Sequence, residues 1–337
     1  MRSRGLTYES LSMLRVLTSS FGYVCLLIFL VLLAYWRPAI GSKGGWLNPP
    51  FMTDLLVIVI FFVQGARLNL DNLVNIFRRP VGSFALQAGI IFLPVLWVKI
   101  FWSLAVIPET LYGPLFFAAI LPTTISSCVV YTGKAKGNAD YSLGHATLSN
   151  LSALVVVPLL WSGSYENSGA FEVLLPKISL LVLVPCLIGW LLSKCFARLA
   201  QVMNMEWGRQ LPMLCIAWLV FLTMCDGIDM IGEDLFLPKI ITVLPYALGF
   251  VILVHLSGWF FSKRWARKKD IQVAQFFCLS QKSLATGLPI ATILFSDNAE
   301  WVMQMILPLF CIHFLQLLVG SFLMPLLKSP HELDDST

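Results

Sequence analysis

Long apolar stretches separated by short polar loops occupy nearly the whole chain. Each stretch is near the roughly 20 residues that a helix needs to cross the hydrocarbon core of a bilayer. The pattern predicts an all-α polytopic membrane protein with ten transmembrane helices. The predicted spans are Leu17 to Trp36, Phe51 to Leu68, Val81 to Phe101, Leu111 to Tyr131, Tyr141 to Trp161, Val173 to Phe196, Leu211 to Ile228, Lys239 to Phe261, Ile271 to Phe295 and Trp301 to Leu326.

Basic residues indicate the orientation of these spans. Placing the N-terminus in the cytoplasm leaves 17 of the 23 Lys and Arg residues on the cytoplasmic side and Lys282 inside a span. Five fall outside: Arg37, Lys43, Lys99, Lys177 and Lys239. Cytoplasmic loops carry an excess of Lys and Arg, so we expect an integral protein of the plasma (inner) membrane with both termini cytoplasmic. Residues 327–337 are expected to form a cytoplasmic tail.

Composition supports the membrane class and excludes several others. Hydrophobic residues make up 58% of the 337 residues and charged residues 12%, with a mean hydropathy of +0.81. The net charge of +5 comes from short basic runs between apolar segments, which is typical of membrane-protein loops and not of nucleic-acid binding. The eight cysteines form no CxxC pair, and the chain has no HExxH, GxSxG or Walker A motif. We therefore expect no enzyme, no disulfide and no metal centre beyond a possible sodium ion.

Ten spans with both ends inside divide into two sets of five that enter the membrane in opposite senses. This is the layout of an inverted repeat, with residues 17–161 and 173–326 as the two halves of a single transporter unit. The fourth span of each half carries Pro and clustered hydroxyls, in Leu121 to Ser127 and in Ser280 to Pro289. Interrupted spans at corresponding positions indicate a transporter's binding site, although such clusters also form helix-to-helix hydrogen bonds.

Lys282 lies near the middle of the ninth span. A lysine at bilayer depth costs roughly 2.5 to 3.5 kcal/mol, so it occurs mainly where it lines a protein interior or a substrate path. Three roles are open: a charge partner of an anion, a substitute for a bound sodium ion, or a cross-link between broken helices through their carbonyls. In the first two roles Lys282 either stays protonated or gains and loses a proton during transport, which would make transport proton-linked. The sequence predicts an anion-binding set of Lys282, Ser283, Thr123, Thr124 and Asn150.

Four motifs carry polar or small residues at distinctive positions: Leu-Pro-Thr-Thr-Ile-Ser-Ser from Leu121, Gly137-Asn138, Ala-Thr-Leu-Ser-Asn-Leu from Ala146, and Ser-Gln-Lys-Ser-Leu-Ala-Thr-Gly-Leu-Pro from Ser280. Together they resemble the bile acid:sodium symporter family, most closely its SBF-like branch. The resemblance implies a core domain, a smaller panel domain and two broken helices that cross in the core. It also implies sodium-coupled uptake of an organic anion by alternating access, without a cofactor. The positions that match the family's sodium sites or their borders are Gln87, Ser126, Ser127, Thr132, Ser142 and Gln281.

One departure from the family changes the expected chemistry. Where the sodium-coupled symporters carry a Glu that bridges both ions, this chain has Phe277, and the alignment near Ser126 lets Cys128 occupy a ligand column instead. Sodium is a hard cation that prefers oxygen ligands, and no Asp or Glu lies in the middle of a span. One or both sodium sites are therefore expected to be lost. His145 either relays protons or, as we favour, is structural.

The sequence thus predicts a secondary transporter of an organic anion, either bile-acid-like or a smaller carboxylate or sulfonate, coupled to sodium or protons. The alternative is a regulatory membrane protein of calcium homeostasis without transport of its own, and loss of the bridging Glu is compatible with it. The expected partners are a small-molecule anion and the lipid bilayer, with no nucleic acid. The oligomeric state leaves no signal in the sequence.

Overall fold

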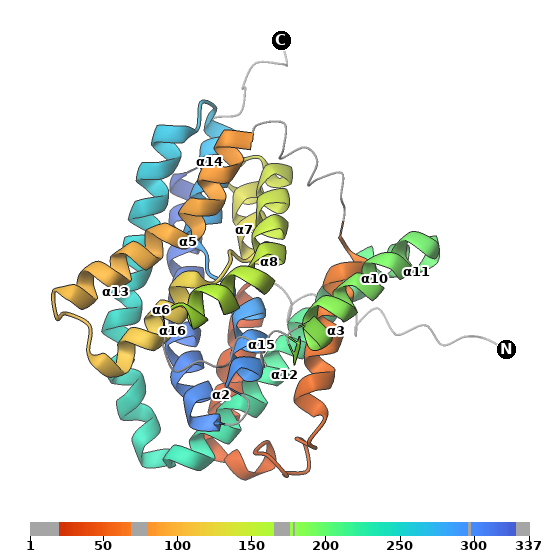
Figure 1. The fold of residues 1–337 in the computed structure, drawn as a ribbon, viewed down its shortest axis with the longest axis vertical. Coiled ribbons are helices and arrows are strands. Elements are labelled where there is room, and N and C mark those ends of the chain that lie inside the picture. The colour runs from red at the N-terminus through yellow and green to blue at the C-terminus, as the bar shows by residue number, and fades with distance from the viewer. Residues whose placement is uncertain (1–19, 69–79, 165–175, 178, 296–297, 328–337) are drawn as a thin grey trace. The chain divides into compact units, whose positions relative to one another are not determined.

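The computed structural model describes residues 20–68, 80–164, 176–177, 179–295 and 298–327, and within these ranges it is helical (Figure 1). The chain forms two compact units, each assembled from two separate stretches of sequence. Unit 1 comprises Met1–Arg67 and Val184–Glu233, and unit 2 comprises Leu68–Leu183 and Asp234–Thr337. Each unit takes residues from both predicted halves. The division into two five-span repeats stays a prediction.

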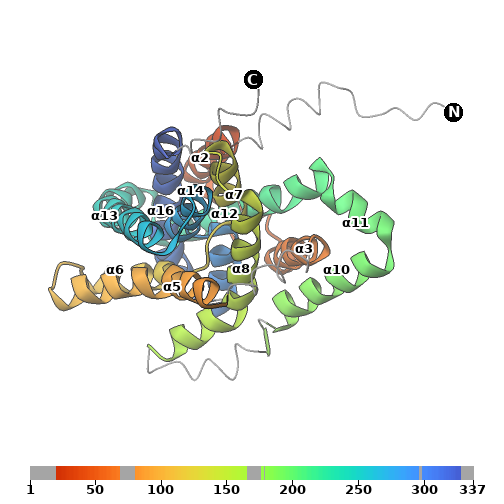
Figure 2. The same cartoon turned by 90° about the horizontal axis from the view of Figure 1, so that it is seen from above.

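Unit 1 contains two helices that approach to backbone contact. Its described elements are α2 (Ser20–Trp36), η1 (Pro38–Ile40), α3 (Met52–Ala66), α10 (Val184–Cys195), α11 (Ala197–Asn204) and α12 (Glu206–Ile231). Figure 2 shows α3 and α10 side by side. A Cβ added to Gly65 would lie 1.9 Å from the Cys186 carbonyl oxygen, and one added to Gly189 would lie 2.1 Å from that of Phe62. Small residues thus allow the close packing that holds many membrane helices together.

Unit 2 holds all of the candidate site residues. Its described elements are α5 (Pro80–Ser103), α6 (Glu109–Ile120), α7 (Ile125–Lys134), α8 (Ala139–Ser162), η2 (Ser179–Leu183), α13 (Glu233–Trp265), α14 (Lys269–Ser280), α15 (Leu284–Leu294) and α16 (Ala299–Leu326). Helices α7, α8 and α14 pack against one another (Figure 2). The Asn138 side chain caps α8 by accepting a hydrogen bond from the Tyr141 backbone N–H at 2.8 Å.

The described helices confirm a membrane protein but not the count of ten spans. Five helices are long and apolar enough to cross a bilayer, or seven if each bent pair is one span. Within the described ranges, α2 and α3 are shorter apolar helices. Residues 17–19 and 173–175 of the predicted first and sixth spans, most of the tail, and basic residues such as Arg2, Arg4 and Arg15 lie outside the described residues. The inverted repeat of ten spans stays a prediction.

Both predicted interruptions are present as breaks between helices. Helix α6 ends at Ile120 and α7 begins at Ile125, with a bend of 62° between them. Helix α14 ends at Ser280 and α15 begins at Leu284, where the Ser283 hydroxyl accepts a hydrogen bond from the Thr286 N–H at 3.2 Å. The second break therefore precedes Gly287 and Pro289, which lie inside α15.

Candidate functional site

The two breaks meet in unit 2. The Ser283 N–H donates to the Pro122 carbonyl at 2.9 Å, which joins the start of α15 to the stretch between α6 and α7. A Cβ added to Gly287 would lie 2.4 Å from Leu121 Cδ1 and 2.7 Å from Leu309 Cδ2. Gly287 therefore permits the close approach of α15 to the first break, and this packing is the role that the structure gives to that glycine. We call the region formed by residues 119–124 and 280–284 the crossing.

Lys282 is fully buried at the crossing and donates to three backbone carbonyls. Its Nζ lies 2.7 Å from Ile90 O, 2.7 Å from Ala119 O and 2.8 Å from Leu121 O. An ammonium group has three N–H donors, so all three are used. Two of the acceptors belong to the C-terminal end of α6, where carbonyls lack intrahelical partners and carry partial negative charge. The arrangement matches one of the roles that the sequence left open, a cross-link between broken helices through their carbonyls. No hydrogen of Nζ remains free in this conformation.

A glutamine from α16 fixes the backbone of Lys282. Gln316 Oε1 accepts from the Lys282 N–H at 2.7 Å, and Gln316 Nε2 donates to the Lys282 carbonyl at 2.7 Å. The same Nε2 lies 2.9 Å from His313 Nδ1. The side-chain amide thus pairs with both polar backbone groups that the break removes from helical bonding. The sequence interpretation missed Gln316 and His313; their signal was two polar residues one turn apart in an apolar span.

A second set of polar side chains ties α8 to both breaks. Asn150 Nδ2 donates to Thr123 O at 2.7 Å and to Ala146 O at 2.8 Å, and Asn150 Oδ1 accepts from the Thr286 hydroxyl. The Ser149 hydroxyl accepts from the Thr123 N–H at 3.4 Å. The structure therefore brings the predicted residues Asn150, Thr123 and Ser283 into one connected region around the crossing.

The hydroxyls of α7 reach the other side of the crossing. Thr124 Oγ1 is hydrogen-bonded to Ser127 Oγ, which donates to Gln281 Oε1 at 3.2 Å. Within the described part of the chain, three buried polar atoms nearby have no hydrogen-bond partner: Gln281 Nε2, Thr123 Oγ1 and Ser280 Oγ. Buried polar groups are nearly always paired. Three unpartnered polar atoms close together therefore indicate a place that a water or a ligand fills.

Two thiols accompany the predicted cation ligands Thr132 and Ser142. The Thr132 hydroxyl donates to Ser142 Oγ at 3.2 Å, and Ser142 Oγ lies 2.9 Å from Cys128 Sγ. Cys128 Sγ lies 3.5 Å from Cys278 Sγ. Cys128 thus occupies the place beside Ser142 for which Ser126 was the other candidate, and Ser126 is exposed in the structure.

Gln87 and His145 form a separate polar chain further along α8. Gln87 Nε2 donates to His145 O at 3.0 Å and lies 3.2 Å from His145 Nδ1. The imidazole ring lies 4.3 Å from the Tyr141 ring, and Gln275 donates to the Tyr141 hydroxyl at 3.2 Å. Among the described residues, His145 Nε2 and the side-chain carbonyl oxygens of Gln87 and Gln275 are buried without a partner. Gln87 therefore contacts His145, and no hydrogen bond joins it to the other predicted cation ligands.

The side chains at the crossing fit poorly to a sodium pair bridged by a carboxylate. Phe277 is fully buried, with its ring 5.5 Å from Tyr131 and 5.1 Å from Phe276, so an aromatic cluster fills the position of the family's Glu. The described residues contain no group of three or more His, Cys, Asp or Glu side chains placed to hold a metal ion. Thiols are soft ligands, which a hard cation such as sodium does not prefer.

Comparison with known proteins identifies the family of the chain. The model of the SBF-like CPA transporter family matches residues 22–329. "Sodium/bile acid cotransporter 7" of Xenopus tropicalis is 28% identical over 90% of this chain and 90% of its own. The protein of the same name from Danio rerio is 26% identical over 90% of this chain and 92% of its own. YfeH of Escherichia coli K12, named as a candidate symporter, is 28% identical over 88% of this chain and 90% of its own. The family match covers most of the sequence and the chain is a non-enzymatic, integral membrane protein: it belongs to the SBF-like CPA transporter family of secondary transporters.

Proposed function

We propose that the protein moves an organic anion across the membrane by alternating access, with the crossing of unit 2 as its transport site. The observation that carries the proposal is the contact between two broken helices around buried, incompletely paired polar groups. Non-helical backbone at membrane depth is tolerated where it is buried in protein or lines a cavity, and such breaks form the substrate sites of many secondary transporters. The names of two relatives, sodium/bile acid cotransporters, support an anion of bile-acid type, and we propose a smaller carboxylate or sulfonate as the other class of substrate.

Lys282 takes the part of a bound cation in this proposal. Its ammonium contacts three carbonyl oxygens at 2.7 to 2.8 Å. Carbonyl oxygens of this kind also coordinate monovalent metal ions. The positive charge offsets the partial negative charge at the C-terminal end of α6. The fixed cation therefore replaces one coupling ion and neutralises the crossing, and it attracts the anion through its field without donating to it directly.

The anion itself is assigned to the N-terminal ends of α7 and α15. Both helices begin at the crossing, and helix N-termini present N–H groups and partial positive charge to anions. Thr123, Thr124, Ser283 and Asn150 line this region, and the unpaired Gln281 Nε2 and Thr123 Oγ1 supply donors. Gln281 Nε2 can only donate and the hydroxyls of Thr123 and Ser280 can donate, so an anion is a ligand that pairs with all three.

Sodium dependence is proposed to be weak. The relatives named as sodium/bile acid cotransporters make sodium the first coupling ion to test. Gln281, Ser127, Thr132 and Ser142 supply neutral ligands, but Phe277 takes the place of the carboxylate that would offset the charge of the ions. Proton coupling through His145 is the second option, since its Nε2 has no partner among the described residues.

The membrane arrangement proposed for this transporter is the ten-span inverted repeat with both termini in the cytoplasm of the plasma (inner) membrane. The breaks α6–α7 and α14–α15 lie in the fourth span of each predicted half, which supports the repeat. The excess of Lys and Arg in the predicted cytoplasmic loops supports the orientation.

Uptake into proteoliposomes tests the function. Labelled taurocholate and a small labelled sulfonate are offered with a sodium gradient, with a proton gradient and with neither. We expect anion accumulation that depends little on sodium. Absence of uptake of every anion under every gradient, by protein shown to be folded and inserted, would favour the regulatory alternative.

A further inference from the structure

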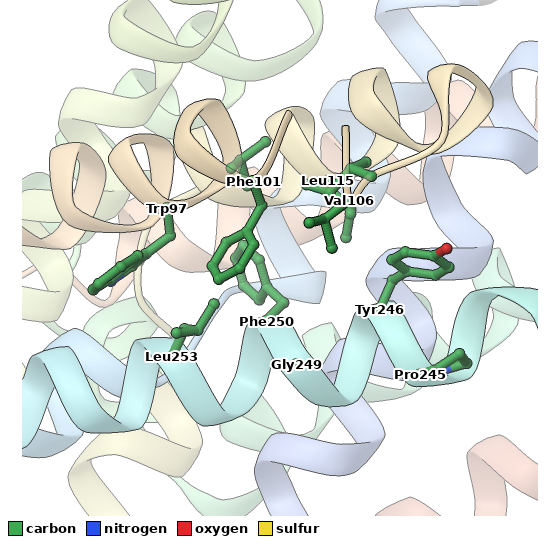
Figure 3. Close-up of a pocket in the computed structure, with 11 residues that line it drawn as sticks. Trp97, Phe101, Val106, Leu115, Pro245, Tyr246, Gly249, Phe250 and Leu253 are labelled. Atoms are coloured by element: carbon green, nitrogen blue, oxygen red, sulfur yellow. The ribbon is translucent and has the colours of Figure 1, made fainter. Parts of the chain in front are cut away.

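An apolar groove lies between α5 and α13 of unit 2, away from the crossing. Its volume is about 240 Å³, and its lining comes from α5, α6, the turn between them and α13. Figure 3 shows Trp97 and Phe101 on one side facing Phe250 and Leu253 on the other. Gly249 lies on α13 between Tyr246 and Phe250 and lines the groove without a side chain (Figure 3).

The lining is free of charge and nearly free of hydrogen-bonding groups. Trp97 Nε1 donates to Ser257 Oγ at 2.7 Å, so the polar atom of this ring is already paired and its carbons face the groove. Tyr246 contributes the single side-chain hydroxyl of the lining (Figure 3). A charged or strongly hydrated solute would lose its hydration water on entering such a groove and would find no hydrogen-bond partners there. The lining therefore selects a hydrocarbon.

The groove continues the lipid-facing surface of the same helices. Next to it on α5, Leu96 is 52% exposed, and next to it on α13, Leu248 is 42% and Ile252 47% exposed. In a membrane protein these exposed apolar side chains contact the acyl chains of the bilayer. The groove extends from the α5–α6 turn at Val106 along α13 from Pro245 to Leu253, a rise of about 12 Å at 1.5 Å per residue. A molecule that enters it sideways from the bilayer thus passes no polar barrier.

We propose that this groove is a binding site for one acyl chain of a membrane phospholipid. The chain lies along α13 against Gly249, between the rings of Phe101 and Phe250, and fills the gap between α5 and α13. It is distinct from the transport site and does not depend on the proposed substrate.

Gly249→Leu tests the proposal by filling the groove. A Cβ at Gly249 meets no atom within 4 Å, so the new side chain starts in open space. Gly82→Leu on α5 is the matched control, because a Cβ there also meets nothing within 4 Å and Gly82 does not line the groove. Any general gain in helix propensity therefore appears in both variants.

Each protein is reconstituted in phosphatidylethanolamine and phosphatidylglycerol vesicles that contain a phosphatidylcholine with a diazirine on one acyl chain. After irradiation, labelled peptides are mapped by mass spectrometry. We expect wild-type label to concentrate at residues 97–107 and 245–253, to fall about tenfold in Gly249→Leu, and to stay unchanged in Gly82→Leu; tenfold corresponds to about 1.4 kcal/mol of binding. Equal labelling of Gly249→Leu and wild type, or displacement of the label by taurocholate, would overturn the proposal.

A second readout does not depend on labelling. Removal of lipid by detergent should lower the melting temperature of the wild type and of Gly82→Leu, because the groove loses its occupant. Gly249→Leu should be less sensitive, since the leucine takes the place of the chain. A loss of melting temperature that is the same in all three proteins would contradict a bound chain in this groove.

Discussion

Lys282 is fully buried without an acidic partner among the described residues, and its Nζ donates to three carbonyls. The cost of taking an ammonium out of water is offset when hydrogen bonds satisfy all of its donors and the field of a helix C-terminus stabilises the charge. The position therefore combines two functions that other proteins give to a metal ion: it supplies a charge and it joins separate backbone segments.

If Lys282 substitutes for a bound sodium ion, its removal should create a sodium requirement. Lys282→Ala leaves three carbonyls without a donor, each of which costs about 1–3 kcal/mol when buried. We expect a lower melting temperature that sodium chloride restores more than choline chloride does. Lys282→Met is the control, because its side chain fills the space without offering room for an ion.

The melting temperature of the wild type should be the same in sodium chloride and in choline chloride. Equal melting temperatures of Lys282→Ala in sodium and choline chloride would show that the three carbonyls form no cation site, and the role of Lys282 would be confined to cross-linking.

Phe277→Glu should not restore sodium coupling. The ring of Phe277 packs against Tyr131 and Phe276, so a carboxylate at this position enters an aromatic environment, where burial disfavours its charged form. We expect a lower melting temperature and no gain in sodium-driven uptake, while Phe277→Leu keeps most of both. Uptake by Phe277→Glu that rises with the sodium gradient would show that a residue at position 277 can still supply a ligand to an intact sodium site.

Some residues of the candidate site could be predicted from the sequence and others could not. Lys282 and Asn150 were predictable, because polar side chains inside an apolar span have few roles. The choice between Ser126 and Cys128 was not, because a shift of one or two residues rotates a helical side chain by one or two hundred degrees and only packing decides it. The clamp by Gln316 was missed, since its partner is a backbone group that has no signature in the sequence.

At the scale of elements, α16 fixes the break between α14 and α15 through the side-chain amide of Gln316. This amide pairs with the backbone N–H and carbonyl of Lys282, as a peptide group of a helix would. Gln316→Leu removes both hydrogen bonds to the Lys282 backbone while keeping a similar volume. We expect a loss of stability of about 1–3 kcal/mol for each backbone group left unpaired, and at least about a tenfold loss of transport because the crossing is no longer fixed.

Gln304→Leu is the control for this prediction on the same helix. Gln304 donates at 3.2 Å to Glu300 in an exposed pair one turn away, which contributes only a few tenths of a kcal/mol. Thermal unfolding and uptake are measured for both variants. If Gln316→Leu behaves like Gln304→Leu, the amide is not what holds the break.

The breaks themselves were predictable as elements, and their limits were not. Pro and clustered hydroxyls in both spans indicated interrupted helices, and the structure places gaps at 121–124 and 281–283. Gly287 and Pro289 lie inside α15, because the capping hydroxyl of Ser283 starts the helix before them, and Gly287 packs closely against Leu121.

At the scale of the whole molecule, hydropathy predicted the helical membrane class because every spanning backbone must satisfy its own hydrogen bonds. It did not predict which helices share a unit. Each unit is assembled from two distant stretches of the chain, and that grouping depends on contacts such as Gly65 with Cys186 and Ser283 with Pro122. The α5–α13 groove was also invisible in the sequence, since an apolar lining has the composition of any membrane helix.

The orientation of unit 2 in the membrane is tested by two single cysteines. Arg267 lies in an exposed run of basic residues after α13, and Leu104 is 65% exposed in the turn between α5 and α6. Basic loops are retained in the cytoplasm, whereas the α5–α6 turn is predicted to lie outside. In a background without the exposed thiols Cys25 and Cys195, a membrane-impermeant maleimide applied to intact cells should label Leu104→Cys. Arg267→Cys should react only after the membrane is permeabilised, and its ready labelling in intact cells would make the ten-span arrangement untenable.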